Sequence, residues 1–199
     1  ISIDGKLLGN IQIDVPGRHN VNNALGAIAL ALDLDIPFNK IQQGLNRYNG
    51  VRRRFEMKYI MDNGIIIIDD YAHHPSEVAA TIQAAKSGWK QRLICIFQPH
   101  LFSRTRDFYL DFANAFQESD IVIVTDIYQA REAPIPGVTA ELIISSAKEM
   151  GHNHVEYIPD QTLVATRLSE LATDNDMIIT MGAGNISRQC ERIYEALKN

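Results

Sequence analysis

The sequence has few cysteines, and their placement does not indicate a disulfide-stabilised scaffold. Among 199 residues only Cys95 and Cys190 are cysteines, the first in an apolar run and the second in a helical pattern near the end of the chain. They do not have the spacing of a metal site, so we expect two buried packing residues in a reducing compartment. This cysteine usage predicts a cytoplasmic protein.

Long apolar runs and basic blocks are also missing. No apolar stretch approaches the roughly 20 residues that span a bilayer, and no signal peptide is evident. The 19 basic and 24 acidic residues are spread along the chain and give a net charge of −5. We therefore expect neither membrane nor nucleic acid among the partners. Because the chain begins at Ile1 instead of methionine, we expect it to be part of a longer protein.

The strongest signal that is present is a set of short, continuous apolar runs. They have the length of strands and are rich in β-branched residues, which is typical of strands buried on both faces of a parallel sheet. The runs occupy residues 65–68, Leu93–Phe97, Ile121–Val124 and Met177–Met181. Helical patterns separate them, and a further strand is expected at 154–158. This alternation predicts an α/β domain over residues 55–199, with a Rossmann-like, doubly wound and mostly parallel sheet.

The first 54 residues have a different pattern. Residues 1–15 alternate apolar and polar side chains around Asp4-Gly5-Lys6, which indicates a hairpin. Helices are expected at 21–34 and 37–48. Two strands and two helices make a small core, so we interpret residues 1–54 as the C-terminal end of a separate, preceding domain.

Polar residues collect directly after the predicted strands. In open α/β sheets ligands bind beyond the carboxyl ends of the strands, where loops and helix N-termini converge. The densest segment is the one that runs from Asp69 to Pro75, DDYAHHP. A carboxylate there could hold a ribose hydroxyl or a metal, and a histidine could orient or deprotonate an amine. The plainer alternative is a capped turn followed by solvated histidines.

Two groups of arginines are candidate anion contacts. Arg104 and Arg106 follow the second buried strand at the start of a helix, where arginine can bind a carboxylate or phosphate with two parallel hydrogen bonds. Positive charge there opposes the helix dipole, which favours a functional role for Arg104 and, less strongly, for Arg106. The run Arg52-Arg53-Arg54 is either a solvated linker or a phosphate contact.

Four segments together resemble the Mur ligase family. They are GRHNVNNA (17–24), GVRRRFE (50–56), DDYAHHP (69–75) and FQPH (97–100), in the order found in members that join L-alanine to UDP-N-acetylmuramate. The third segment also resembles the related murein tripeptide recycling ligases. The fourth, together with residues 103–106, favours the biosynthetic branch.

The resemblance implies a three-domain enzyme of peptidoglycan synthesis. A UDP-sugar-binding domain would come first, then a central ATPase domain, then a C-terminal Rossmann-like domain that recruits the amino acid. Residues 1–54 would be the end of the central domain, and residues 55–199 the whole third domain. Such ligases use ATP and Mg²⁺ to make an acyl phosphate, which the amine of the amino acid then attacks.

The resemblance also assigns nucleotide contacts. Asn20 and Asn23 match a pair near the adenine, and Arg54 matches an arginine that reaches the γ-phosphate. Asp70 matches the acid beside the ribose, and Tyr71 matches a residue of the nucleotide and amino-acid pocket.

The amino-acid side of the site is assigned in the same way. His73 matches a pocket residue that acts on the amine, Tyr71 lines the same pocket, and Arg104 is expected to hold the alanine carboxylate. Two positions depart from the family pattern. Leu101 stands where arginine is frequent, which places more weight on Arg104, and Asn185 stands where aspartate is frequent.

A phosphate-binding loop of the form GxxxxGK[ST] does not occur in these residues. We therefore expect the phosphate lysine and the Mg²⁺ ligands upstream, no metal site in this chain, and no ligase activity from the chain alone. Two other classes remain open. One is a metal-dependent hydrolase that uses Asp69, Asp70, His73 and His74, and the other is a non-catalytic binding module.

Overall fold

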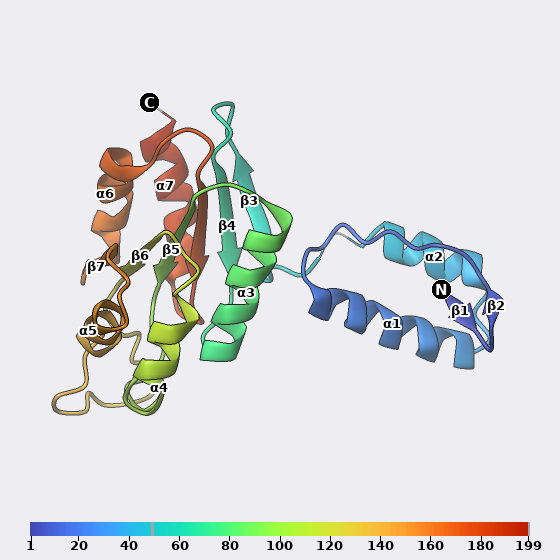
Figure 1. The fold of residues 1–199 in the computed structure, drawn as a ribbon, viewed down its shortest axis with the longest axis horizontal. Coiled ribbons are helices and arrows are strands. Elements are labelled where there is room, and N and C mark those ends of the chain that lie inside the picture. The colour runs from blue at the N-terminus through green and yellow to red at the C-terminus, as the bar shows by residue number, and fades with distance from the viewer. Residues whose placement is uncertain (49, 199) are drawn as a thin grey trace. The chain divides into compact units, whose positions relative to one another are not determined.

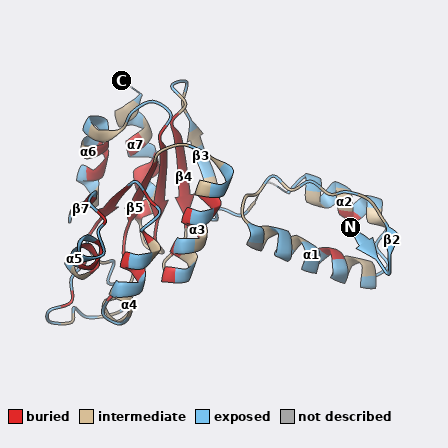
Figure 2. Cartoon of the chain, in the orientation of Figure 1, coloured by how far each residue is buried: buried red, intermediate tan, exposed pale blue. Residues whose placement is uncertain are grey.

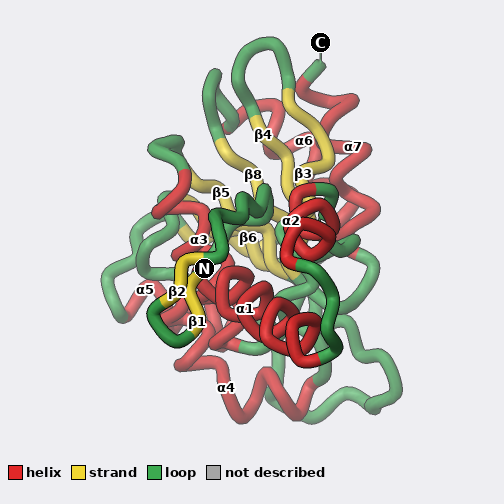
Figure 3. Tube along the Cα trace, turned by 90° about the vertical axis from the view of Figure 1, so that its right-hand side faces the viewer, coloured by secondary structure: helices red, strands yellow, loops and turns green. Residues whose placement is uncertain are grey.

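A computed structural model describes residues 1–48 and 50–198 and divides the chain into two compact units, 1–51 and 52–199. The first unit contains a small hairpin, formed by β1 (Ser2–Ile3) and β2 (Lys6–Leu7), and two helices, α1 (Arg18–Asp33) and α2 (Phe38–Asn46). The two helices lie side by side (Figures 1 and 3). The hairpin and both helices confirm the pattern expected from the sequence.

Few side chains of the first unit are buried. Ile28 and Ile41 are its buried apolar residues. Large apolar side chains on α1 stay exposed, among them Leu25 at 47% and Leu30 at 62%. Exposed apolar patches often mark contacts with another domain or chain, so these side chains are candidates for such a contact.

The second unit is an α/β domain around one sheet with the strand order β3-β4-β8-β5-β6-β7 (Figure 1). Strands β4 to β8 run parallel, and β3 pairs antiparallel with β4 at one edge. The strand bounds are Glu56–Ile60 (β3), Ile66–Asp70 (β4), Leu93–Phe97 (β5), Ile121–Val124 (β6), Val155–Tyr157 (β7) and Met177–Met181 (β8). The sheet confirms the predicted fold class.

Helices cover both faces of this sheet, as a doubly wound fold requires. One core contains side chains of three helices, α3 (Pro75–Gly88), α4 (Phe102–Ala115) and α5 (Glu141–Glu149). The other contains side chains of α6 (Val164–Leu171) and α7 (Gln189–Leu197). Short 3₁₀ turns, Gln161–Leu163 and Ile186–Arg188, precede these last two helices.

The central strands are buried along their whole length. Every residue of β4, β5 and β8 is buried, which Figure 2 shows as a continuous red layer. Burial on both faces is the reason that these strands read as unbroken apolar runs in the sequence. No helix among the described residues is long and apolar enough to cross a membrane.

Candidate functional site at the strand ends

The carboxyl ends of four neighbouring strands, β4, β8, β5 and β6, meet at one edge of the sheet. Asp70 ends β4 and pairs with Met181 of β8, and Phe97 of β5 pairs with the same methionine. Val124 of β6 pairs with Phe97 in turn. The polar segments that follow these strands therefore converge, as the sequence predicts.

The two acids at the end of β4 are tied up by the protein itself. Asp70 is 6% exposed, and its oxygens accept hydrogen bonds from the backbone N–H groups of Phe55 and Ala72, both at 2.7 Å. Asp69 is 2% exposed and accepts from the Thr180 hydroxyl at 2.8 Å. Burial raises the pKa of both carboxyls above the usual range, against the opposing effect of these hydrogen bonds.

Arg53 lies in the loop that precedes β3 and connects that loop to the turn that follows β8. Its Nε lies 3.1 Å from Oδ2 of Asp69, and its two Nη atoms donate to the carbonyl oxygens of Gly182 and Gly184. Its guanidinium carbon lies 4.9 Å from the centre of the Tyr71 ring, and that of Arg54 lies 5.6 Å from the same centre. The middle arginine of the run is therefore a structural clamp, which the sequence did not reveal.

A row of rings continues from Tyr71 across the edge. The ring centres of Tyr71 and His73 are 5.1 Å apart, those of His73 and His100 are 5.9 Å apart, and those of His100 and Tyr128 are 5.7 Å apart. Nδ1 of His73 lies 2.9 Å from the carbonyl oxygen of Tyr71. Because a carbonyl oxygen only accepts, Nδ1 carries the proton in this contact and Nε2 of neutral His73 carries the free lone pair.

Arg104 lies beside His100, the third ring of this row. Its Nη1 lies 3.4 Å from Nδ1 of His100 and 3.5 Å from the His100 carbonyl oxygen. Burial, and after it the charge of Arg104, lowers the pKa of His100 below its usual value. Arg106, by contrast, is exposed and paired with Asp107. The structure therefore groups Arg54, Asp70, Tyr71, His73 and Arg104 at one edge.

Two glutamates that the sequence did not single out hold the loops of this edge. Glu77 accepts from the backbone N–H groups of His73 and His74, at 3.0 and 3.2 Å. Glu132 accepts from the backbone N–H of Ser103 at 2.9 Å and also from its hydroxyl. Both carboxylates satisfy N–H groups at the start of a helix, which otherwise lack partners within the helix.

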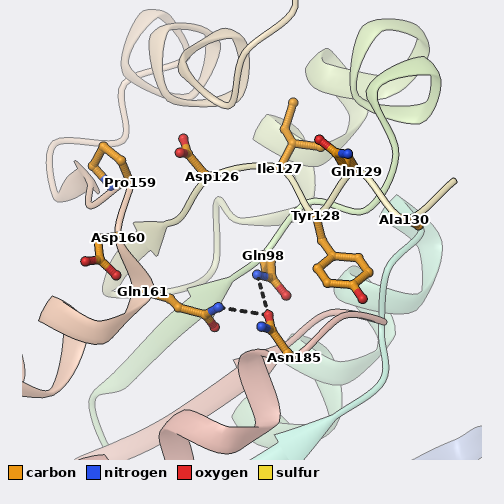
Figure 4. A pocket seen from close by; sticks show the side chains of 10 residues that line it. All are labelled: Gln98, Asp126, Ile127, Tyr128, Gln129, Ala130, Pro159, Asp160, Gln161 and Asn185. Carbon is orange, nitrogen blue, oxygen red and sulfur yellow. Dashed lines mark hydrogen bonds between the residues drawn. The ribbon is translucent and has the colours of Figure 1, made fainter. Parts of the chain in front are cut away.

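A cavity of about 380 Å³ lies beyond Tyr128 at the same edge of the sheet (Figure 4). Oδ1 of Asn185 accepts from Nε2 of Gln98 at 3.0 Å and from Nε2 of Gln161 at 2.8 Å. Both glutamine Oε1 atoms are buried without a partner. Asn185, one of the two departures from the family pattern, thus organises one wall of the cavity.

The other departure, Leu101, has a backbone role. Leu101 has a φ of 74° and immediately precedes α4, and its carbonyl oxygen accepts from the backbone N–H and the hydroxyl of Thr105. Its own N–H donates to the Tyr128 carbonyl at 3.0 Å.

Asn20 and Asn23 belong to the first unit. They line a mostly apolar pocket of about 330 Å³ with Ile13, Val15, Ala24, Ala27, Leu45 and Tyr48. Nδ2 of Asn20 donates to the Pro16 carbonyl at 2.6 Å. Its Oδ1 can accept a hydrogen bond from an amino group of a ligand.

The described residues do not bring three or more typical metal ligands together. Across residues 1–48 and 50–198, no group of three or more His, Cys, Asp or Glu side chains could hold a metal ion. Asp69 and Asp70 bind Arg53, Thr180 and backbone N–H groups instead. The hydrolase alternative therefore has no donor set among these side chains.

The fold defines a Rossmann-like domain whose candidate ligand site lies at the carboxyl ends of its strands. Residues 53–184 match the family described as Mur ligase, glutamate ligase domain. The chain therefore belongs to the Mur ligase family.

Individual relatives agree with this assignment. The chain is 44% identical over 200 residues to a UDP-N-acetylmuramate–L-alanine ligase from Salinibacter ruber, covering 100% of this chain and 42% of the relative. It is 47% identical over 194 residues to one from Geotalea uraniireducens, covering 98% of this chain and 42% of the relative. The crystal structure of the UDP-N-acetylmuramate-alanine ligase from Thermotoga maritima matches with a TM-score of 0.83 and 30% identity, over 98% of this chain and 41% of that chain. The chain thus spans about two-fifths of the length of these proteins.

Proposed function

We propose that the complete protein joins L-alanine to UDP-N-acetylmuramate with ATP, through an acyl phosphate. The observation that carries the proposal is the contact between Arg104 and a neutral His100 beside His73, at the edge where such folds bind ligands. A fixed guanidinium next to two imidazoles suits an amino acid, whose carboxylate needs a cation and whose amine needs a base. The names of the relatives supply the substrates.

Arg104 is the proposed partner of the alanine carboxylate. Guanidinium and carboxylate can form two parallel charge-assisted hydrogen bonds, which would fix the orientation of the amino acid. His73 is the proposed base, because the Nδ1 contact to the Tyr71 carbonyl leaves the Nε2 lone pair for the ammonium proton. The unprotonated amine then attacks the acyl carbon, the C–N bond forms, and inorganic phosphate leaves.

ATP is the proposed co-substrate, with its adenine at Asn20 and Asn23. The pocket that these asparagines line in the first unit is mostly apolar with two amide groups, which suits a flat base with a polar edge. Arg54 is the proposed γ-phosphate contact, and Tyr71 and Asp70 the proposed nucleotide neighbours. Because both Asp70 oxygens already bind backbone N–H groups, its proposed part at the ribose is secondary to fixing the loop.

Mg²⁺ is proposed as a cofactor of the complete protein. Among the described residues no group of three or more His, Cys, Asp or Glu side chains could hold a metal ion, so its ligands are expected mainly upstream of this chain. We also propose that residues 1–54 end a larger ATP-binding domain and that residues 55–199 form the third domain. The exposed apolar side chains of α1 support the first part, and the two buried thiols fit a cytoplasmic location.

The test is product formation by the complete protein and by residues 1–199 alone. With ATP, Mg²⁺, labelled L-alanine and UDP-N-acetylmuramate, we expect the complete protein to form the amide and to release phosphate in equal amounts. Residues 1–199 alone are expected to form none, because they contain no phosphate-binding loop. Failure of the complete protein to use alanine would contradict the proposal, and activity of residues 1–199 alone would contradict the domain assignment.

A further inference from the structure

Tyr128 stands between the proposed alanine site and the cavity of Figure 4. Its ring stacks on His100 at a centre distance of 5.7 Å and an interplanar angle of 19°. The ring also packs so close to Gly184 that a Cβ added to that glycine would lie 2.7 Å from Cγ of the tyrosine. The same tyrosine is one of the residues that line the cavity. One ring thus borders both spaces.

The backbone holds this ring in place. The N–H of Tyr128 donates to the Pro99 carbonyl at 2.8 Å, and the Tyr128 carbonyl accepts from Leu101 at 3.0 Å. His100, between those two residues, forms an isolated parallel bridge with Tyr128. Because the Tyr128 backbone is hydrogen-bonded to the residues on both sides of His100, its ring keeps its position relative to Arg104, which His100 contacts.

The polar side chains that line the cavity next to Tyr128 are acids and amides. No basic residue is among the ten residues that line it. Asp126 and Asp160 contribute carboxylates, and the amides come from Gln98, Gln129, Gln161 and Asn185. Hydrogen bonds from Thr162 hold the pKa of the Asp160 carboxyl below its usual range, which keeps this side chain negatively charged. About 380 Å³ is far more room than a methyl side chain needs, and its charge suits an amino group.

We propose that Tyr128 determines specificity for alanine by closing the amino-acid site off from this acidic cavity. This inference rests on the proposed function. With the ring removed, the side chain of a longer amino acid enters the cavity, and one that ends in an ammonium group is favoured by Asp126 and Asp160. The bond chemistry is unchanged, since the α-amine still displaces phosphate from the acyl carbon.

The test compares three amino acids in the complete protein: L-alanine, L-2,4-diaminobutyrate and L-norvaline, the neutral isostere of the diamino acid. We expect Tyr128→Ala to raise kcat/KM for diaminobutyrate relative to alanine by roughly tenfold or more, the size of effect that a side-chain pocket produces. Tyr128→Phe keeps the ring and is expected to keep the wild-type ratio. Adding Asp160→Asn to Tyr128→Ala should lower the gain for diaminobutyrate but not that for norvaline.

The outcomes distinguish a failure of the inference about Tyr128 from a failure of the proposed ligase function. If the wild type fails to use alanine, the proposed function is wrong, and this inference falls with it. If the wild type is active but folded Tyr128→Ala keeps the wild-type ratio, or uses none of the three amino acids, Tyr128 is no wall between the two spaces. Thermal melting establishes folding, and Tyr128→Leu replaces the alanine variant if that variant does not fold.

Discussion

Arg53 and Asp69 form an ion pair that connects the loop before β3 to the end of β4. Their Nε and Oδ2 atoms are 3.1 Å apart, and the aspartate side chain is 3% exposed. A second clamp stands at the amino end of β8, where Arg92 binds Asp176 with Nη2 and Oδ2 at 2.6 Å and the aspartate side chain is 2% exposed. Both arginines also bind backbone carbonyl oxygens. Arg92 and Asp176 lie at the amino ends of β5 and β8, the opposite edge of the sheet from the candidate site.

These clamps give a matched test of how Arg53 acts. Lysine in either place loses the planar fork and at least one hydrogen bond, so Arg53→Lys and Arg92→Lys should each lower the free energy of unfolding by about 1–3 kcal/mol. Only Arg53→Lys shifts the Tyr71 ring and the Gly182–Gly184 turn. It should therefore lower kcat/KM of the complete protein by roughly tenfold or more, since small misplacements at a site have effects of this size.

The measurements are chemical denaturation and steady-state kinetics on both variants. Equal losses of stability with a kinetic defect only in Arg53→Lys would support a positioning role. Equal kinetics in the two variants would reduce Arg53 to a purely structural residue.

His100 should titrate at lower pH than a free histidine. Burial and the nearby Arg104 charge both disfavour its protonated form. A histidine whose folded pKa is lowered destabilises the fold as pH drops through its unfolded pKa of about 6.5 and down to the folded value. Below that range the cost is complete, and it fades as the pH rises above the unfolded pKa of about 6.5.

NMR titration of the His100 ring checks this expectation. Arg104→Gln removes the charge and should move the midpoint of His100 upward, with Arg106→Gln as the control, because Arg106 is paired with Asp107. A midpoint that does not move in Arg104→Gln would show that the charge of Arg104 does not act on His100.

Asn23 gives a test of the pocket in the first unit. It lines that pocket, whereas its neighbour Asn22 is not among the lining residues. Asn23→Ala in the complete protein should weaken ATP binding by about 1 kcal/mol, or roughly fivefold, the usual contribution of one hydrogen bond. Asn22→Ala should leave the Kd for ATP unchanged in calorimetry, and equal effects of the two changes would remove Asn23 from the nucleotide site.

The sequence was most informative about the central sheet, because strands buried on both faces must be apolar at every position. β4, β5, β6 and β8 were predicted within a residue or two for this reason. β3 was not predicted, since it is an edge strand with charged residues such as Glu56 and Lys58. The Asn63-Gly64 pair between β3 and β4 was the available signal of a hairpin.

The grouping of candidate residues at this edge was predictable where they follow a strand in the sequence or lie in a recognisable motif. Asp70, His73 and Arg104 follow strands, and Arg54 lies in a motif. The clamp of Arg53 was missed because its carbonyl partners lie 129 and 131 positions away. Glu132 was missed similarly, since it caps α4 from a loop 29 positions downstream. Such contacts depend on the strand order, which periodicity does not encode.

The most direct test of the account is the alanine dependence of Arg104→Ala in the complete protein. Losing a charge-assisted bidentate contact of about 2 kcal/mol should raise the KM for alanine roughly thirtyfold. The KM for ATP should change little, and Arg106→Ala, two residues along the same helix, should change neither. An unchanged KM for alanine in Arg104→Ala would contradict the assignment of this edge of the sheet to the amino acid.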